Sequence, residues 1–227
     1  MPGKDQYTKL LLHCDGTDAS TTFTDSELEP IKTVTANGNA QLDTAQKKFG
    51  TASGLFDGTG DYLSIPDHAD WDFGTGDFTI DFWVRYSSVT TLYLSRRIKG
   101  GSGNWNDFYY NGTNIIIYIN DSAVITTAWT PSANTWYHVE YGRSGTNVRV
   151  FIDGVQQGST GTSSANIVGT DEFNFGWDAA AGSLNGWLYE IRISKGIARH
   201  TANFTPNTVS YGSVTHANAF FEDYKPG

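Results

Sequence analysis

The chain has 227 residues, and its 15 Lys and Arg against 24 Asp and Glu give a formal net charge of −9 at pH 7. Because this field repels phosphate backbones and no Lys/Arg patch interrupts it, the composition argues against a nucleic-acid partner. The one cysteine, Cys14, excludes an intramolecular disulfide, so stability has to come from the core.

The first segment, "MPGKDQYTKLLLHCDG", holds only a short apolar run, Leu10 to Leu12, and no small-residue cleavage site. It therefore does not resemble a signal peptide. No stretch approaches the roughly 20 apolar residues that span a bilayer, so we expect no membrane insertion.

The tetrapeptide Gly-Thr-Gly-Asp occurs twice, at 58–61 and 74–77, each time before an apolar or aromatic run. The two aspartate carboxylates could bind a metal or a sugar. The simpler interpretation is a turn, in which glycines supply unusual backbone angles and the Asp accepts nearby N–H groups. We expect turns.

Period-2 alternation predicts strands at several places. In 78–85 the odd and even positions separate an apolar face from a mixed one, and 114–120 is apolar on both faces. In 148–153 and 187–194 alternation continues, and the second of these places the following residues on one face: Trp187, Tyr189, Ile191 and Ile193. Asn-Gly and Asp-Gly turns separate the runs. The pattern predicts an all-β jelly-roll sandwich of two antiparallel sheets.

Three segments carry a family resemblance: 49–85 ("FGTASGLFDGTGDYLSIPDHADWDFGTGDFTIDFWVR"), 134–158 ("NTWYHVEYGRSGTNVRVFIDGVQQG") and 184–206 ("LNGWLYEIRISKGIARHTANFTP"). Together they resemble the laminin G-like, pentraxin-like branch of the concanavalin A-like lectin/glucanase superfamily. The closing segment is similar to tail, fibre and surface proteins of bacteriophages. The resemblance implies one jelly-roll domain over residues 1–207. Residues 208–227 are then a C-terminal tail, expected to add an edge strand or to dock on a neighbour.

Family members bind carbohydrate, protein or lipid, and some relatives cleave β-glucans with a Glu-x-Asp-x-Glu or Glu-x-Asp-x-x-Glu strand. No glutamate of this chain has an Asp two residues later. We therefore expect no enzyme activity. The alternative is a glycan hydrolase or lyase with a non-standard active site.

Aromatic side chains beside amides and carboxylates suit sugars, which present apolar C–H faces flanked by hydroxyls. Trp105 in "GGSGNWNDFYYNG" and Trp177 in "FGWDAAAGSLNGW" have such neighbours. The predicted glycan-binding residues are Asn104, Trp105, Asn106, Asp107, Trp177 and Asp178. The alternative is that these tryptophans cap the core, which is the role expected for Trp71 and Trp187.

Many relatives hold a structural Ca²⁺ between the first strand and the last. The resemblance places Asp15 and Glu190 at the equivalent positions, although Tyr189 stands where relatives often have an Asp. Two carboxylates with carbonyls and waters could satisfy the 6–8 oxygen ligands of Ca²⁺. Ordinary salt bridges are the alternative.

The sequence predicts a non-enzymatic binding or structural module on a virion surface, a capsid decoration or tail-associated protein made in the host cytoplasm. Its expected ligand is a glycan or a bacterial cell-surface polysaccharide. Other virion proteins are expected partners, through the tail, with a homo-oligomer or virion assembly as the working state. A purely structural virion protein and a fragment of a secreted adhesin are rival interpretations.

Overall fold

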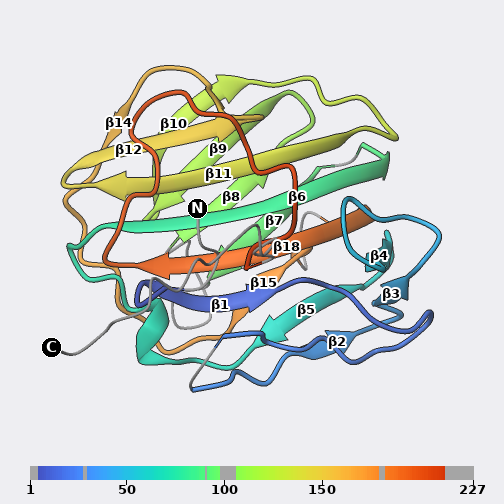
Figure 1. Cartoon of the computed structure of the whole chain (residues 1–227). Helices are drawn as coiled ribbons and strands as arrows, with labels where there is room; N and C mark the ends of the chain where they lie inside the picture. The colour runs from blue at the N-terminus through green and yellow to red at the C-terminus, as the bar shows by residue number, and fades with distance from the viewer. Residues whose placement is uncertain (1–4, 28–29, 90, 98–105, 179–181, 213–227) are drawn as a thin grey trace, which may run out of the picture.

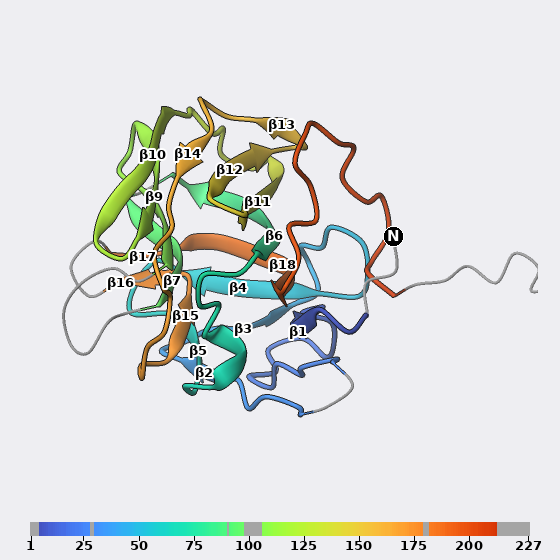
Figure 2. The same cartoon turned by 90° about the vertical axis from the view of Figure 1, so that its left-hand side faces the viewer.

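The computed structural model describes residues 5–27, 30–89, 91–97, 106–178 and 182–212. Nearly all regular structure there is antiparallel β, in two sheets that face each other (Figure 2). This confirms the predicted all-β sandwich. Within these residues we find no helix of the length and apolarity that a bilayer crossing requires.

The larger sheet forms one layer, in the order β13-β12-β11-β6-β18-β4-β3, with β1 also paired to β18 and β14 to β12. Its strands are β1 (Thr8–Leu12), β3 (Gln41–Asp43), β4 (Ser53–Asp57), β6 (Phe78–Ser88), β11 (Trp136–Ser144), β12 (Asn147–Ile152), β13 (Val155–Gln156), β14 (Gly161–Thr162) and β18 (Asn185–Lys195). The long strands β6 and β18 lie side by side at its centre (Figure 1).

The smaller sheet forms the second layer, in the order β10-β9-β8-β7-β15-β5-β2. Its strands are β2 (Thr35–Asn37), β5 (Tyr62–Ile65), β7 (Leu92–Arg97), β8 (Asn106–Tyr110), β9 (Asn114–Ile119), β10 (Ser122–Ala128) and β15 (Phe173–Phe175). A separate two-stranded ribbon of β16 (Trp177–Asp178) and β17 (Gly182–Ser183) follows β15, and the 3₁₀ turn Ala69–Trp71 follows β5.

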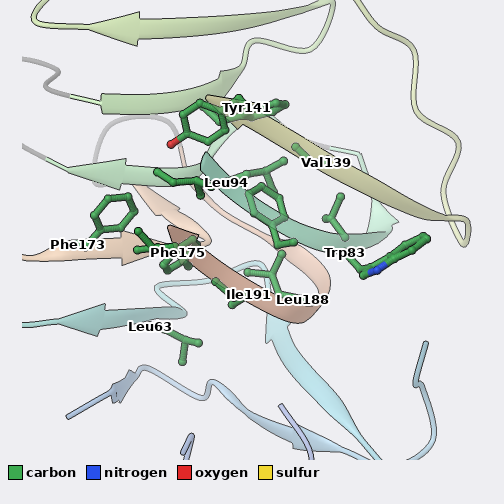
Figure 3. Close-up of a cluster of buried hydrophobic side chains, with 14 of the residues drawn as sticks. Leu63, Trp83, Leu94, Val139, Tyr141, Phe173, Phe175, Leu188 and Ile191 are labelled. Atoms are coloured by element: carbon green, nitrogen blue, oxygen red, sulfur yellow. The ribbon is translucent and has the colours of Figure 1, made fainter. Parts of the chain in front are cut away.

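The core fills the space between the sheets (Figure 3). Phe82 of β6 illustrates the packing, because its ring lies 6.3 Å from Phe108 and 6.3 Å from Phe175, both on the smaller sheet. Trp71 is fully buried, which confirms its predicted core role. Burying apolar area of this kind is the main favourable term in folding.

The alternation predicted for 78–85 is confirmed, since Phe78, Ile80, Phe82 and Val84 belong to the core. The alternation predicted for 187–194 is wrong in its second half. Glu190 adopts a positive φ of 51° and the register with β6 shifts between Tyr189 and Arg192, which marks a β-bulge. After the bulge Arg192 shares the outer face with Trp187 and Tyr189, and Ile191 and Ile193 join the core.

Both Gly-Thr-Gly-Asp segments are turns, as predicted. Asp61 is fully buried and accepts hydrogen bonds from the N–H groups of Asn39 (2.6 Å) and Asp57 (2.7 Å). Asp77 accepts the N–H of Gly145 at 2.7 Å. Both carboxylates therefore act as turn caps.

After β18 the chain turns back and crosses the outer face of the larger sheet; we call residues 197–212 the strap (Figure 1). At one end it meets the tight turn between β12 and β13, where Phe204 N–H donates to Gly154 O at 2.9 Å. A Cβ on Gly154 would lie 1.9 Å from Phe204 O, and its φ is +77°. Only glycine fits both conditions.

Residues 208–212 belong to the strap, and the side chain of Tyr211 packs against the larger sheet and is only 6% exposed. The predicted tail therefore begins with residues that pack on the domain. The rest of that segment, 213–227, lies outside the described residues, so its docking role stays a prediction.

Candidate functional site

The sequence-predicted glycan residues come from two segments that the fold brings together at β7. Asn106 and Asp107 begin β8, which pairs with β7, and Trp177 and Asp178 form β16, which packs beside β7. Asn104 and Trp105 lie outside the described residues, as do the side chains of Trp177 and Asp178. Glycan binding by this group stays a prediction.

The two members with described side chains are both buried. Asn106 and Asp107 are 0% exposed, and in this conformation they offer no surface to a ligand. Burial raises the pKa of Asp107 well above its usual range, although Arg96 and the Arg97 N–H, which donates to Asp107 Oδ1 at 3.0 Å, act in the opposite direction. Burial thus favours the neutral form of this carboxyl.

The carboxylates proposed for calcium both have partners within the chain. Asp15 Oδ1 accepts the N–H groups of Thr51 and Ala52, the latter at 3.2 Å. Glu190 contacts His13 Nδ1 through Oε1 at 2.5 Å and accepts the Tyr211 N–H through Oε2 at 2.7 Å. Within the described ranges no three His, Cys, Asp or Glu residues gather as metal ligands would. Calcium binding stays a prediction.

A cavity lies on the outer face of the larger sheet, where the strap crosses it. We call it the aromatic hollow, and its volume is about 530 Å³. Its lining residues are Lys48, Phe49, Trp83, Trp136, Asp153, Thr205, Pro206, Asn207 and Thr208. Three aromatic rings thus share one cavity with a cation, a carboxylate, an amide and hydroxyls.

One wall comes from the loop between β3 and β4. Phe49 sets its ring edge against Trp83, at a centroid distance of 5.6 Å and an interplanar angle of 89°. Lys48 extends its ammonium over the Trp83 ring, 4.1 Å from the centroid. Trp83 faces outward because the alternation of β6 turns Phe82 and Val84 inward. Its ring contacts Phe49, Lys48 and His138, and it is only 6% exposed.

The opposite wall comes from β11 and the turn after β12. Trp136 begins β11 and stays half-buried. Asp153 has a φ of 49° and precedes Gly154, whose φ is also positive, the conformation of a tight type I′ hairpin turn. Asp153 Oδ1 accepts the His138 N–H at 2.8 Å, which fixes the carboxylate at the rim of the hollow.

The strap closes the third side, and a buried polar cluster holds it down. Asp81 is fully buried; its Oδ2 accepts Arg192 Nε–H at 2.9 Å and its Oδ1 accepts the Tyr211 hydroxyl at 2.6 Å. The Arg192 guanidinium also lies 3.8 Å from the Tyr211 ring centroid. Burial favours the neutral acid, but Arg192 and His138 outweigh it and hold the pKa of Asp81 below its usual range.

A second contact pins the middle of the strap. His200 Nδ1 lies 2.9 Å from Glu140 Oε2, and its ring stacks on Phe204 with centroids 3.5 Å apart. A smaller cavity of about 190 Å³ remains between the strap and the sheet, and Thr205 and Asn207 line it as well as the hollow. The strap therefore shapes both cavities.

Sequence reasoning missed this site. Trp83 and Trp136 stand in strands, whereas the prediction favoured tryptophans in glycine-rich loops. The available signal was the alternation of 78–85, which already placed Trp83 and Arg85 on the non-core face. Trp187, predicted to be core, is half-buried on the same outer face, where its Nε1–H donates to Asp43 Oδ2 at 2.8 Å.

Fold and cavity together define a two-sheet jelly-roll domain with an aromatic-lined cavity on one outer face. A family model described as the concanavalin A-like lectin/glucanases superfamily matches residues 57–201, more than half of the chain. The chain belongs to this family. A comparison with curated proteins gives no match.

Solved structures share the fold at low identity. Domain 4 of AbnA, a GH43 extracellular arabinanase from Geobacillus stearothermophilus solved with arabinotriose, is 18% identical with a TM-score of 0.60, over 84% of this chain and 94% of that one. The binding domain of Paraclostridial Mosquitocidal Protein 1 is 14% identical with a TM-score of 0.65, over 85% of this chain and 50% of that one.

A sialidase from Trypanosoma rangeli, solved with 2,3-difluorosialic acid as a covalent intermediate, is 14% identical with a TM-score of 0.60, over 86% of this chain and 32% of that one. The chain thus spans nearly all of the arabinanase domain, half of the toxin domain and a third of the sialidase. At these identities the likeness shows the fold, which binding domains and enzymes share.

Proposed function

We propose that this chain is a non-enzymatic carbohydrate-binding domain and that the aromatic hollow holds the sugar. The observation that carries the proposal is the composition of the hollow: the half-buried Phe49 and Trp136 offer ring surfaces beside the nearly buried Trp83, and Lys48 and Asp153 offer charged hydrogen-bonding groups at its rim. Apolar surface with a few fixed polar groups is the usual make-up of a small-ligand site.

The comparisons support a sugar ligand. The family is named for lectins and glucanases, and one structural neighbour was solved with arabinotriose. A volume of about 530 Å³ lies within the usual range of ligand pockets, about 300–1,000 Å³. The ligand class follows from this chemistry, and the identity of the sugar is the object of the test below.

The carboxylates support binding over catalysis, because, of the described ones, Asp153 alone lines the hollow and the acids beneath the strap are engaged in internal contacts. Asp81, Glu140 and Glu190 are nearly fully buried, and each contacts a side chain or backbone group of the chain. A glycosidase needs two carboxylates free to meet the scissile bond. These three instead hold the strap in place.

We also propose the setting that the sequence suggests, a module on the surface of a bacterial virus that attaches to a host polysaccharide. The similarity of residues 184–206 to phage tail and fibre proteins supports this setting. Binding to host cells would be its first test.

The test of the binding site is a glycan array followed by calorimetry on wild type, Trp136→Ala, Trp105→Ala and Val155→Ala. Val155 is 52% exposed on β13 and does not line the hollow, so its variant controls for surface truncation. We expect Trp136→Ala to lose about 2 kcal/mol of binding free energy, roughly thirtyfold in affinity, as for a central aromatic contact.

Loss of binding in Trp105→Ala with full binding in Trp136→Ala would move the site to the loop before β8. An array on which no glycan binds would refute carbohydrate binding altogether. Release of reducing sugar or unsaturated product from a bound polysaccharide would refute the non-enzymatic part.

A further inference from the structure

Beside the hollow, tryptophans and cations alternate on the outer face of the larger sheet. Arg85 of β6 stands directly between Trp136 of β11 and Trp187 of β18 in the strand register. Its guanidinium carbon lies 4.8 Å from the Trp187 ring centroid. Trp83 precedes Arg85 by two residues on the same face, about 7 Å along the strand, and carries the Lys48 ammonium. We call these five residues the cation–aromatic track.

Among the residues that the structure describes, the two cations of the track form no close ion pair. Across the described ranges neither Lys48 nor Arg85 lies within 4.0 Å of a carboxylate, the limit for an ion pair. Other well-buried cations of the larger sheet and strap are fully engaged: Arg192 pairs with Asp81 at 2.9 Å, Arg199 pairs with Asp5 at 3.1 Å, and Arg143 donates to backbone carbonyls of Gly74, Gly76 and Ala165. Ring faces hold the two charges of the track in place without a carboxylate in direct contact.

The charge of Lys48 is also poorly solvated. Partial burial lowers the pKa of its ammonium, and the attraction of Asp153 only partly opposes this. The carboxylates at the two ends of the track are already engaged, because Asp153 accepts the His138 N–H and Asp43 accepts the Trp187 Nε1–H. An anionic group from outside would relieve this cost and make a charge-assisted hydrogen bond.

We infer that the track binds an acidic oligosaccharide, one sugar unit in the aromatic hollow with its anionic group at Lys48 and a following unit beside Arg85 and Trp187. This rests on the proposed carbohydrate-binding function and adds the ligand class and a second subsite. The formal net charge of −9 means that the chain as a whole repels a polyanion, so binding of an acidic glycan would have to come from the track itself. Local complementarity has to overcome that repulsion.

The experiment measures affinity by biolayer interferometry for three probes: a galacturonic acid hexamer, its fully methyl-esterified form, and a sulfated galactan oligosaccharide of matched length. The ester keeps the sugar and removes the charge, and the sulfated probe separates sulfate from carboxylate as the preferred anion. Each probe is measured at low and at physiological salt, since attraction between exposed charges weakens with ionic strength.

The variants are Lys48→Gln, Arg85→Gln and the control Lys47→Gln. Lys47 is exposed, adjacent in sequence and absent from the lining of the hollow, so its variant makes the same charge change outside the track. We expect each track variant to bind at least one acidic probe roughly tenfold more weakly than wild type, as for loss of one charge-assisted contact. The ester should bind equally to all of them, and Lys47→Gln should behave as wild type.

Equal affinity of wild type for the acidic and esterified hexamers and for the sulfated probe would overturn the inference, as would equal losses in Lys48→Gln and Lys47→Gln. A wild type that binds neutral glycans on the array but none of the acidic probes would overturn it and leave carbohydrate binding intact. If no glycan of any kind binds, both fall together.

Discussion

Two fully buried aspartates, one on the outer face of each sheet, have pKa values that are shifted in opposite directions. Asp81 on β6 and Asp107 on β8 are both 0% exposed. Asp81 meets Arg192 and the Tyr211 hydroxyl, and its pKa lies below the usual range. Asp107 Oδ2 has Arg96 no closer than 3.9 Å and no hydrogen-bond partner among the described residues, and burial raises its pKa.

The difference teaches that partners, and not depth, decide whether a buried carboxyl carries charge. On the larger sheet Arg192 and His138 favour the charged form of Asp81. The charged carboxylate in turn holds Tyr211 of the strap that lines the aromatic hollow. On the smaller sheet the same residue type is expected to be neutral. Three substitutions are described from the largest expected effect on stability to the smallest, and the pH dependence of Asp81→Asn follows them.

Arg192→Met removes the partner and leaves Asp81 buried with its charge. Loss of one member of a buried ion pair costs about 3–5 kcal/mol of unfolding free energy. Urea unfolding measures it, with Arg85→Met as the control, because Arg85 lies on the same sheet face and forms no ion pair with any residue that the structure describes. If both variants lose the same stability, the Asp81 cluster does not hold the strap.

Gly154→Ala tests the contact between the strap and the turn after β12. The new Cβ would meet the Phe204 carbonyl oxygen and also sit at a positive φ. We expect a loss of about 2–4 kcal/mol from clash and backbone strain together. Gly145→Ala is the matched control: its φ is +59° with nothing within 4 Å of the Cβ, so only the backbone term of about 1 kcal/mol applies.

Equal losses in the two glycine variants would mean that the strap yields freely at Phe204. A larger loss in Gly154→Ala should be accompanied by weaker ligand binding, because residues 205–208 line the hollow.

Asp107→Asn replaces a carboxyl expected to be neutral with an amide of the same shape, so at pH 4 we expect a change below about 1 kcal/mol. Because its folded pKa is raised, Asp107 contributes stability below its unfolded pKa of about 3.9 that is lost as pH rises towards the folded value. Wild type should therefore lose stability relative to the variant from pH 4 to pH 8. Urea unfolding at both pH values measures the difference, and a difference that stays constant would contradict the raised pKa.

The contribution of Asp81 has the opposite sign. Its folded pKa is lowered, so its stabilisation is present above about pH 3.9 and is lost as pH falls towards the folded value. Wild type should accordingly lose stability in acid, and Asp81→Asn should flatten that loss. The two aspartates thus predict that the unfolding free energy rises with pH through Asp81 and falls with pH through Asp107.

The sequence was sufficient for the sandwich and for the strand 78–85, because period-2 alternation and Asn-Gly or Asp-Gly turns are local signals. It was not sufficient for the faces of 187–194. A bulge is a single residue at a positive φ, here Glu190, and no composition or period marks it in advance.

The site was less predictable than the fold. Lys48, Trp83, Trp136 and Asp153 lie on four segments, and only the strand register and the return of the strap bring them to one cavity. The predicted residues Asn106 and Asp107 looked like ligand contacts because polar residues beside a tryptophan suit sugars, but β8 buries them. Sequence shows which side chains have the right chemistry, and tertiary contacts decide which of them meet.

The bulge at Glu190 sets the faces of β18 through the number of residues in the strand rather than through the identity of its side chain. Deleting that one position would remove the bulge and leave Ile191 and Ile193 facing the core and Arg192 facing outward, because Ile191 would then follow Tyr189 in regular alternation. In a library of single-residue deletions along β18, loss of residue 190 should therefore be tolerated better than loss of Arg192, which would turn Ile193 to the outer face. One extra residue in the strand thus reverses the sheet face on which every later side chain lies.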